Sequence, residues 1–459
     1  MFFGIDRVVQ NTVGAEVYGR FFILLNIAII FQIFLDLGIE NFIRKEVAQY
    51  PTRSGSYLSN IIALKILMFI PYLIVCASIA MHKGISVDNY LLLFLILLNQ
   101  FLASFILYIR ANLGGLQLFK TESFISVLDR TLMILIVGFL LLYPVTRYLF
   151  RINWFVFAQT ISYTFTLMLG LFILVKKTGT VKLHIQFKQI IPVIQKLKPY
   201  ALLLFLMAVY YRADSIILSL LLPNGDEQAG IFAHAFRILD FMSNYAFLFP
   251  ILLLPIFSKT LHQKQKIDGL LQLAVLLLII PSLTVIGPAI LYRRELFGLL
   301  YKEHINLSAD VFAILTISYL GMCVSFTFGA LLTANGNLKQ LNLMAGTAVV
   351  INLILNLILI PRYQVMGAAI ANASTQLFTL IVHIKLAWSI FKLKFNAIIL
   401  IKFSVFILFM LFGGYLIKLI NIHWLLGASI LFSSGLLAAI IIGLISINGI
   451  RSILQERIQ

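Results

Sequence analysis

Residues 91–98 read LLLFLILL and residues 273–280 read LAVLLLII. Strands of a membrane barrel alternate apolar and polar residues, so continuous apolar runs favour helices that span a bilayer. The whole chain agrees, since 61% of its 459 residues are hydrophobic, 11% are charged and its mean hydropathy is +1.02. Soluble proteins need about a quarter of their residues charged. The sequence therefore predicts an all-α integral membrane protein.

Apolar segments of spanning length recur along the chain, because about 20 residues cross a bilayer as a helix. We predict thirteen spans, at residues 20–43, 57–80, 90–113, 124–143, 153–175, 199–222, 229–257, 268–290, 308–334, 341–360, 367–391, 398–420 and 425–447. An apolar stub at residues 1–5 resembles the end of one more span. The fold expected is thus one of 13–14 transmembrane helices.

Lysine and arginine are distributed unequally between the two sides of these spans. One set of alternate gaps, together with the C-terminal tail, carries 18 of them and the other set carries 7. Basic residues are retained in the cytoplasm, so the richer set and the C-terminus are expected there. An odd number of spans cannot place both ends inside, and we therefore expect the stub to be the end of a truncated first helix.

Three weak similarities occur in the same order in both halves of the chain. The clearest pairs residues 14–21 (GAEVYGRF) with residues 225–232 (GDEQAGIF), and both copies lie on the same predicted side. A repeat of this kind predicts two six-helix lobes related by an axis along the membrane normal. The expected domains are an N-terminal lobe at 1–175, a basic cytoplasmic linker at 176–198, a C-terminal lobe at 199–391, and two extra helices with a tail at 392–459.

Four charged residues lie near the predicted midplane of two consecutive spans, and each such charge costs about 2.5–3.5 kcal/mol at a helix centre. Arg237 and Asp240 are three residues apart and can pair on one helix face, whereas Arg212 and Asp214 are two apart and cannot. We predict that Arg212 and Arg237 bind substrate, because a guanidinium group forks two bonds to phosphate oxygens. Asp214 and Asp240 are predicted to carry a coupling ion or to balance charge. For Arg237 and Asp240, a self-neutralised structural pair is an equal alternative.

Several kinds of site are not found in the sequence. It has no phosphate-binding loop, zinc-protease helix or nucleophile elbow, and Cys76 and Cys323 stand alone without a metal or redox motif. The gaps between spans are too short for a catalytic domain. We therefore expect neither an enzyme nor a cofactor. The net charge of +18 does not predict nucleic-acid binding, because the basic residues lie in the gaps between spans.

Residues 13–21 (VGAEVYGRF), followed by residues 36–39 (DLGI) and Arg44, resemble the opening signature of Wzx-type oligosaccharide flippases of polysaccharide biosynthesis. Further matches cover nearly the whole chain and include Asp214, residues 230–232 (GIF) with Arg237, residues 334–336 (ANG) with Lys339, and residues 361–363 (PRY). The resemblance implies the multidrug/oligosaccharidyl-lipid/polysaccharide exporter superfamily, whose fold is two six-helix lobes around a central cavity.

For function, the resemblance implies a flippase that moves a polyprenyl-diphosphate-linked oligosaccharide across a bacterial cytoplasmic (inner) membrane by alternating access. The product would enter surface polysaccharide such as the O-antigen of lipopolysaccharide. Expected partners are the lipid-linked oligosaccharide, the bilayer, a polysaccharide polymerase and glycosyltransferases. Two alternatives stay open, a cation-coupled multidrug exporter of the same superfamily and a non-transporting scaffold of a polysaccharide assembly complex.

Overall fold

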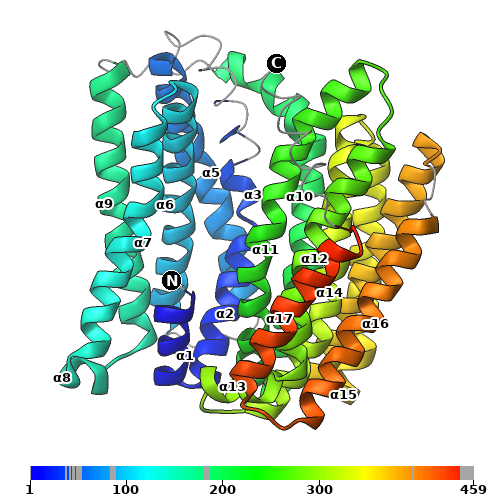
Figure 1. The fold of residues 1–459 in the computed structure, drawn as a ribbon. Helices are drawn as coiled ribbons and strands as arrows, with labels where there is room; N and C mark the ends of the chain where they lie inside the picture. The colour runs from blue at the N-terminus through cyan, green and yellow to red at the C-terminus, as the bar shows by residue number, and fades with distance from the viewer. Residues whose placement is uncertain are drawn as a thin grey trace. The chain divides into compact units, whose positions relative to one another are not determined.

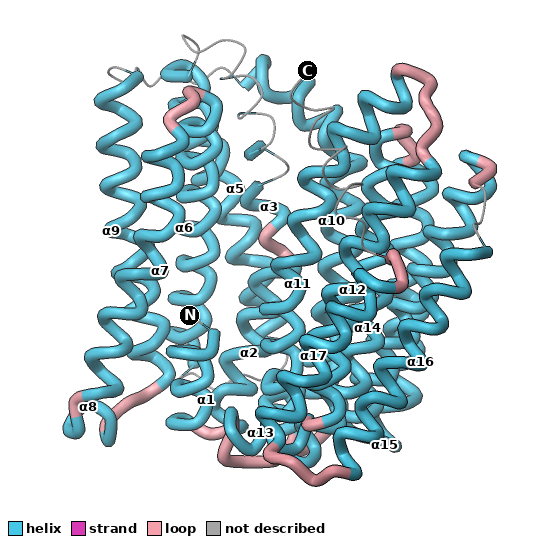
Figure 2. Tube along the Cα trace, viewed as in Figure 1, coloured by secondary structure: helices cyan, strands magenta, loops and turns pink. Residues whose placement is uncertain are grey.

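The computed structural model describes residues 2–36, 39–40, 43, 47, 54–82, 89–178, 187–393 and 397–444. Within these ranges the chain forms helices and short connections and contains no strand (Figure 2). Eleven helices in the described ranges are long and apolar enough to cross a membrane. The prediction of an all-α membrane fold is thereby confirmed.

The chain divides into two compact units, Met1–Ala233 and His234–Gln459 (Figure 1). The first unit contains η1 (Phe2–Asp6), α1 (Arg7–Val13), α2 (Ala15–Ile30), α3 (Ile33–Asp36), α5 (Ser54–His82), α6 (Tyr90–Gly115), α7 (Phe119–Leu142), α8 (Pro144–Tyr148), α9 (Ile152–Thr178), α10 (Phe187–Leu221) and the start of α11 (Gly225–His262). The second unit contains the rest of α11, α12 (Asp268–Leu291), α13 (Arg293–Leu300), α14 (Ile305–Ala334), α15 (Leu338–Phe391), α16 (Ala397–Leu419) and α17 (Trp424–Ile441).

The predicted linker at 176–198 lies partly outside the described residues, which omit 179–186. Its flanks belong to the end of α9 and the beginning of α10. The compact units are defined by packing, whereas the predicted lobes are defined by a sequence repeat. Their boundaries therefore need not coincide. The domain boundaries drawn from the sequence stay a prediction.

Helix α15 is a hairpin of two antiparallel helices. A straight helix of its 54 residues would be roughly 81 Å long. Instead, Gln364 adopts φ 50° and ψ −131°, and Asn352 Nδ2 lies 3.5 Å from Thr375 Oγ1, 23 residues further on. A Cβ atom at Gly367 would collide with the carbonyl of Leu359, so the reversal requires glycine there. The hairpin supplies the two spans predicted at 341–360 and 367–391.

The span predicted at 20–43 is not one straight helix. Helix α2 ends at Ile30, a turn follows at Phe31 and Gln32, and α3 resumes at Ile33. The backbone carbonyl of Leu35 in α3 accepts hydrogen bonds from the side chains of Lys65 and Ser104. Side chains of α5 and α6 therefore hold this carbonyl. Such tertiary hydrogen bonds cannot be predicted from apolar composition alone.

The core of the first unit forms around α6, which packs against α9 and α7 (Figure 1). Gly170 of α9 allows this close packing, because a Cβ at that position would lie 3.2 Å from Ile109 Cγ2 of α6. In the second unit, α17 packs against α12 and α16 through small residues. Gly435 of α17 faces Met410 and Thr284, which places the small-residue stripe of this helix in a packed interface.

Candidate functional site

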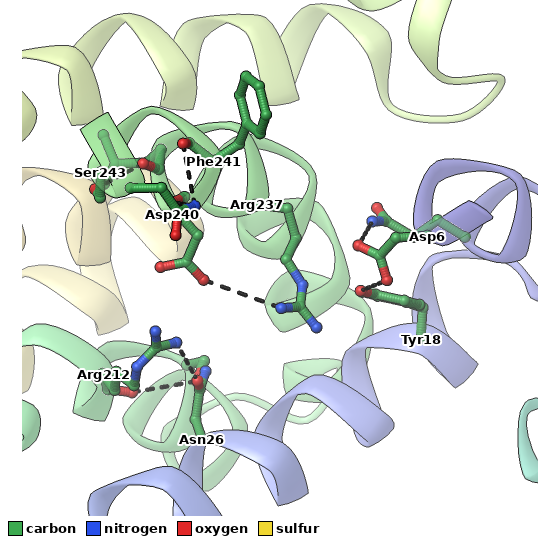
Figure 3. Close-up of polar contacts among 12 residues, drawn as sticks. Asp6, Tyr18, Asn26, Arg212, Arg237, Asp240, Phe241 and Ser243 are labelled. Carbon is green, nitrogen blue, oxygen red and sulfur yellow. Dashed lines mark hydrogen bonds and ion pairs between the residues drawn. The ribbon is translucent and has the colours of Figure 1, made fainter. Parts of the chain in front are cut away.

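Arg212 is positioned on α10 by a contact with α2 inside the first unit (Figure 3). Its Nη1 donates to Asn26 Oδ1 at 3.0 Å, and Asn26 Nδ2 donates to Ser215 Oγ at 2.8 Å. Asn26 is only 1% exposed, so its amide has a fixed orientation, whereas Arg212 is half-buried. Because an amide is neutral, this contact orients the guanidinium group without removing its charge.

Asp214 lies on a different face of α10 from Arg212. It is fully buried, and its neighbour Ser215 is buried as well. The two-residue spacing turns the side chains about 200° apart. The structure therefore does not bring Arg212 and Asp214 together on one helix face.

Arg237 and Asp240 form the ion pair that their spacing predicts (Figure 3). Arg237 Nη1 lies 4.0 Å from Asp240 Oδ2, and the two side chains are 17% and 21% exposed. This distance is at the outer limit for an ion pair, and partly hydrated pairs of this kind are weak. The arginine therefore has a carboxylate close by at ion-pair distance.

The two copies of the repeated motif pack against each other within the first unit. A Cβ at Gly19 of α2 would collide with the backbone carbonyl of Asp226, and a Cβ at Gly230 of α11 would collide with that of Ala15. Ala15 and Gly19 hold the same positions in the first copy as Asp226 and Gly230 hold in the second. The contact is thus reciprocal, as across a two-fold axis, which supports the predicted parallel repeat.

An ion pair lies beside this glycine contact. Arg20 Nε is 3.0 Å from Asp226 Oδ2, and Arg20 Nη2 is 3.1 Å from Glu16 Oε1. Ser219 Oγ of α10 donates to the other oxygen of Asp226 at 3.3 Å. The start of α11 is therefore joined to both α2 and α10 by polar side chains.

Two buried charged residues are not among those predicted from the sequence. Lys65 of α5 is 1% exposed and lies 3.9 Å from Asp36 of α3. Asp6 is buried and accepts hydrogen bonds from Tyr18 at 2.9 Å and Gln10 at 3.2 Å (Figure 3). The position of Lys65, eight residues inside the apolar segment at 57–80, is a signal that could have identified it.

The remaining candidates have simpler surroundings. Asp129 lies 3.4 Å from the adjacent Arg130, whose side chain is 59% exposed. Cys76 and Cys323 are buried and form no disulfide. Among the residues that the structure describes, no group of histidine, cysteine, aspartate or glutamate could hold a metal ion.

Comparison with known proteins adds family and fold to this geometry. Residues 3–261 match the family described as "Polysaccharide biosynthesis protein". The structure resembles the lipid II flippase MurJ in an inward closed conformation, with a TM-score of 0.68 and 15% identity over 96% of this chain and 95% of that chain. A sequence comparison with curated proteins gives no match.

Two further solved structures share the fold. An inward-facing multidrug resistance MATE family transporter of the MOP superfamily has a TM-score of 0.60 and 14% identity over 85% of this chain and 94% of its own. A MOP superfamily transporter from Pyrococcus furiosus has a TM-score of 0.56 and 13% identity over 84% of this chain and 89% of its own. At these identities the resemblance concerns the fold, which is that of MOP superfamily transporters.

Proposed function

The chain belongs to the polysaccharide biosynthesis protein family, and from this premise we propose that it flips a polyprenyl-diphosphate-linked oligosaccharide across a bacterial cytoplasmic membrane by alternating access. The fold of MOP superfamily transporters supports a transport function. On this proposal the chain is a carrier and not an enzyme, its C-terminus is cytoplasmic, and a polymerase and glycosyltransferases act on the same lipid-linked sugar.

The observation that carries the proposal is the oriented guanidinium group of Arg212. Arg212 lies nine residues before the end of α10, which is about 14 Å and close to the middle of a hydrocarbon core about 30 Å thick. A diphosphate headgroup cannot enter that core without replacing its hydration. A guanidinium group fixed by a neutral amide can supply two hydrogen bonds to phosphate oxygens at that depth.

We assign the other predicted site residues by their surroundings. Arg237 offers a second phosphate-binding position, and Asp240, at 4.0 Å from it, balances its charge when no phosphate is bound. Asp214 is fully buried. Its proposed role is therefore to carry a coupling ion or to balance charge inside the first unit, and not to contact the sugar.

Replacing Arg212 and Arg237 with alanine, singly and together, tests the proposal in cells that depend on this chain for surface polysaccharide. Each single variant is expected to reduce surface polysaccharide and to leave lipid-linked oligosaccharide in the inner leaflet, and the double variant is expected to abolish export. Arg130→Ala is the matched control, because Arg130 is an exposed arginine paired with its neighbour. Undiminished surface polysaccharide in a properly inserted double variant would remove the arginines from the mechanism.

The same variants separate the proposal from a multidrug exporter. A carrier of cationic drugs needs carboxylates in its binding site, so loss of the two arginines should leave drug resistance unchanged or raise it. Resistance to cationic compounds on overexpression, insensitive to both arginine changes, would favour that alternative. Loss of polysaccharide caused only by changes in the basic segment at 176–198 would favour a scaffold.

A further inference from the structure

Lys65 is a buried amine that donates hydrogen bonds to two neutral groups. Its Nζ donates to the backbone carbonyl of Leu35 at 2.7 Å and to Ser104 Oγ at 2.5 Å. Ser104 Oγ in turn donates to the same Leu35 carbonyl at 3.0 Å. The three groups form a closed triangle that joins α5, α3 and α6, and each of the three residues is no more than 2% exposed.

This triangle is satisfied whether or not Lys65 carries a charge. A neutral amine keeps two N–H donors, and the triangle uses two, one to Leu35 and one to Ser104. A protonated amine has a third N–H, and Asp36 Oδ1 lies 3.9 Å from Nζ, which is within ion-pair range but too long for a hydrogen bond. The two hydrogen bonds that Lys65 donates in the triangle are therefore made in both charge states, and the Asp36 carboxylate offsets the charge of the ammonium by ion pairing.

Asp36 connects this amine to the surface of the first unit. Its Oδ1 lies 3.9 Å from Lys65 Nζ, and its side chain is 32% exposed where that of Lys65 is 1% exposed. In the described part of the chain, the charged groups that act on Lys65 are Asp36 and Glu40, both on the segment containing α3. From α6 it is faced by Ser104 and by the ring of Phe105, whose centroid is 5.9 Å from Nζ.

The site is built on α3, which is separated from α2 by the turn at Phe31 and Gln32. Both acceptors of Lys65 that α3 supplies, the Leu35 carbonyl and the Asp36 carboxylate, lie beyond that turn. The charge on Lys65 therefore changes its attraction to the Asp36 carboxylate of α3, while the hydrogen bonds of the triangle are made in both charge states.

We propose that Lys65 and Asp36 form a proton-binding site in the first unit, and that its proton occupancy controls the attachment of α3 to α5 and α6. To release the proton, the ammonium of Lys65 transfers it to the carboxylate of Asp36, leaving an amine and a carboxylic acid, and Asp36 then gives it to water. Uptake reverses these steps. The link from this proton to transport rests on the proposed function, whereas the proton site itself does not.

The test uses the full chain in lipid nanodiscs, with lysine labelled by ¹³C at Cε, and follows the lysine NMR signals from about pH 5 to about pH 9. The Lys65 signal is identified by its loss in Lys65→Arg, a variant that keeps the charge and cannot release it at these pH values. In the native chain we expect this signal to titrate and hydrogen exchange of residues 33–36, corrected for its intrinsic pH dependence, to change over the same pH interval. In Lys65→Arg and in Asp36→Asn the pH dependence of exchange should disappear.

A matched control and a transport assay complete the design. Lys176→Arg changes an exposed lysine at the end of α9 and should leave both readouts native. In proteoliposomes carrying a polyprenyl-diphosphate oligosaccharide, Lys65→Arg should lose the acceleration that an imposed pH gradient gives the native chain. A Lys65 signal that does not titrate, or exchange in α3 that follows pH equally in Lys65→Arg, would overturn the proton site. Titration and coupled exchange in a native chain that moves no lipid-linked sugar would sustain the site and refute the proposed function.

Discussion

Asn26 decides what the guanidinium group of Arg212 can offer to a ligand. The amide is held by Ser215 and cannot move away, so any change at Asn26 is felt directly by the arginine at 3.0 Å. Asn26 therefore affects phosphate binding by Arg212 through the orientation of the guanidinium group. A neutral amide at this position does not compete with phosphate for the arginine, whereas a charged partner would.

Exchanging Asn26 for aspartate or alanine separates these two effects. Asn26→Asp keeps the size of the side chain and adds a charge-assisted hydrogen bond to Arg212, which contributes about 1.5–3 kcal/mol, or roughly a tenfold or larger loss of phosphate affinity. Asn26→Ala only releases the arginine and should cost less transport. Export of lipid-linked oligosaccharide in vesicles measures both, with Asn335→Asp in an exposed turn as the control. Equal export by Asn26→Asp and the native chain would contradict this reading of the site.

Asp6 offers a second test at this scale. It is buried with two donors, Tyr18 and Gln10, so its carboxylate is a structural acceptor inside the first unit. Tyr18→Phe removes the hydroxyl and leaves the carboxylate with one fewer hydrogen bond, which should lower stability by about 1.5–3 kcal/mol. Thermal unfolding in detergent measures the loss. Tyr148→Phe, at a highly exposed tyrosine, should leave the unfolding temperature unchanged.

At the scale of helices, the contact between α2 and the start of α11 depends on two glycines, Gly19 and Gly230, which have no side chain. Gly19→Ala and Gly230→Ala each place a methyl group against a backbone carbonyl that cannot rotate away, so overpacking should cost about 1–3 kcal/mol. Gly346→Ala in α15 is the matched control, because nothing lies within 4 Å of its added Cβ. That change should stabilise the helix by about 0.5–1 kcal/mol. If all three variants unfold at the same higher temperature, the close contact does not exist in the protein.

In the α15 hairpin, by contrast, introducing a glycine is predicted to raise stability. Gln364 has φ 50° and ψ −131°, a conformation that glycine adopts freely and other residues adopt at a cost of about 1–3 kcal/mol. Gln364→Gly should therefore raise stability in thermal unfolding, whereas Gln364→Ala should not. A lower unfolding temperature for Gln364→Gly would show that the reversal depends on the glutamine side chain.

At the scale of the whole molecule, the distribution of basic residues predicts the sidedness of the chain. A fluorescent protein fused after Gln459 should fluoresce, because it would fold in the cytoplasm, and a periplasmic phosphatase fused after Asn224 should be active. If the fluorescent protein were dark and the phosphatase inactive, the orientation of the chain would be the reverse of the predicted one. The fold and the contacts described above would be unaffected, since neither depends on which side is the cytoplasm.

How much could be predicted from the sequence depended on the range of the interaction. The spans other than 20–43 and the Arg237–Asp240 pair follow from local composition and helical spacing, and both are found. The donors Lys65 and Ser104, which hold the Leu35 carbonyl beyond the turn at Phe31 and Gln32, were missed because they lie far along the chain. The partner of Arg212 was missed for the same reason, since Asn26 is 186 residues away.

The reciprocal glycine contact also says something about descent. In an ancestral homodimer of identical halves, both sides of a true two-fold contact would have carried the same side chains. Here the acidic residue opposite Arg20 is Asp226, while its counterpart in the first copy is Ala15, and the counterpart of Arg20 is Ile231. The asymmetry of the ion pair therefore arose after the two halves were free to diverge, whereas the two glycines preserve a symmetric contact.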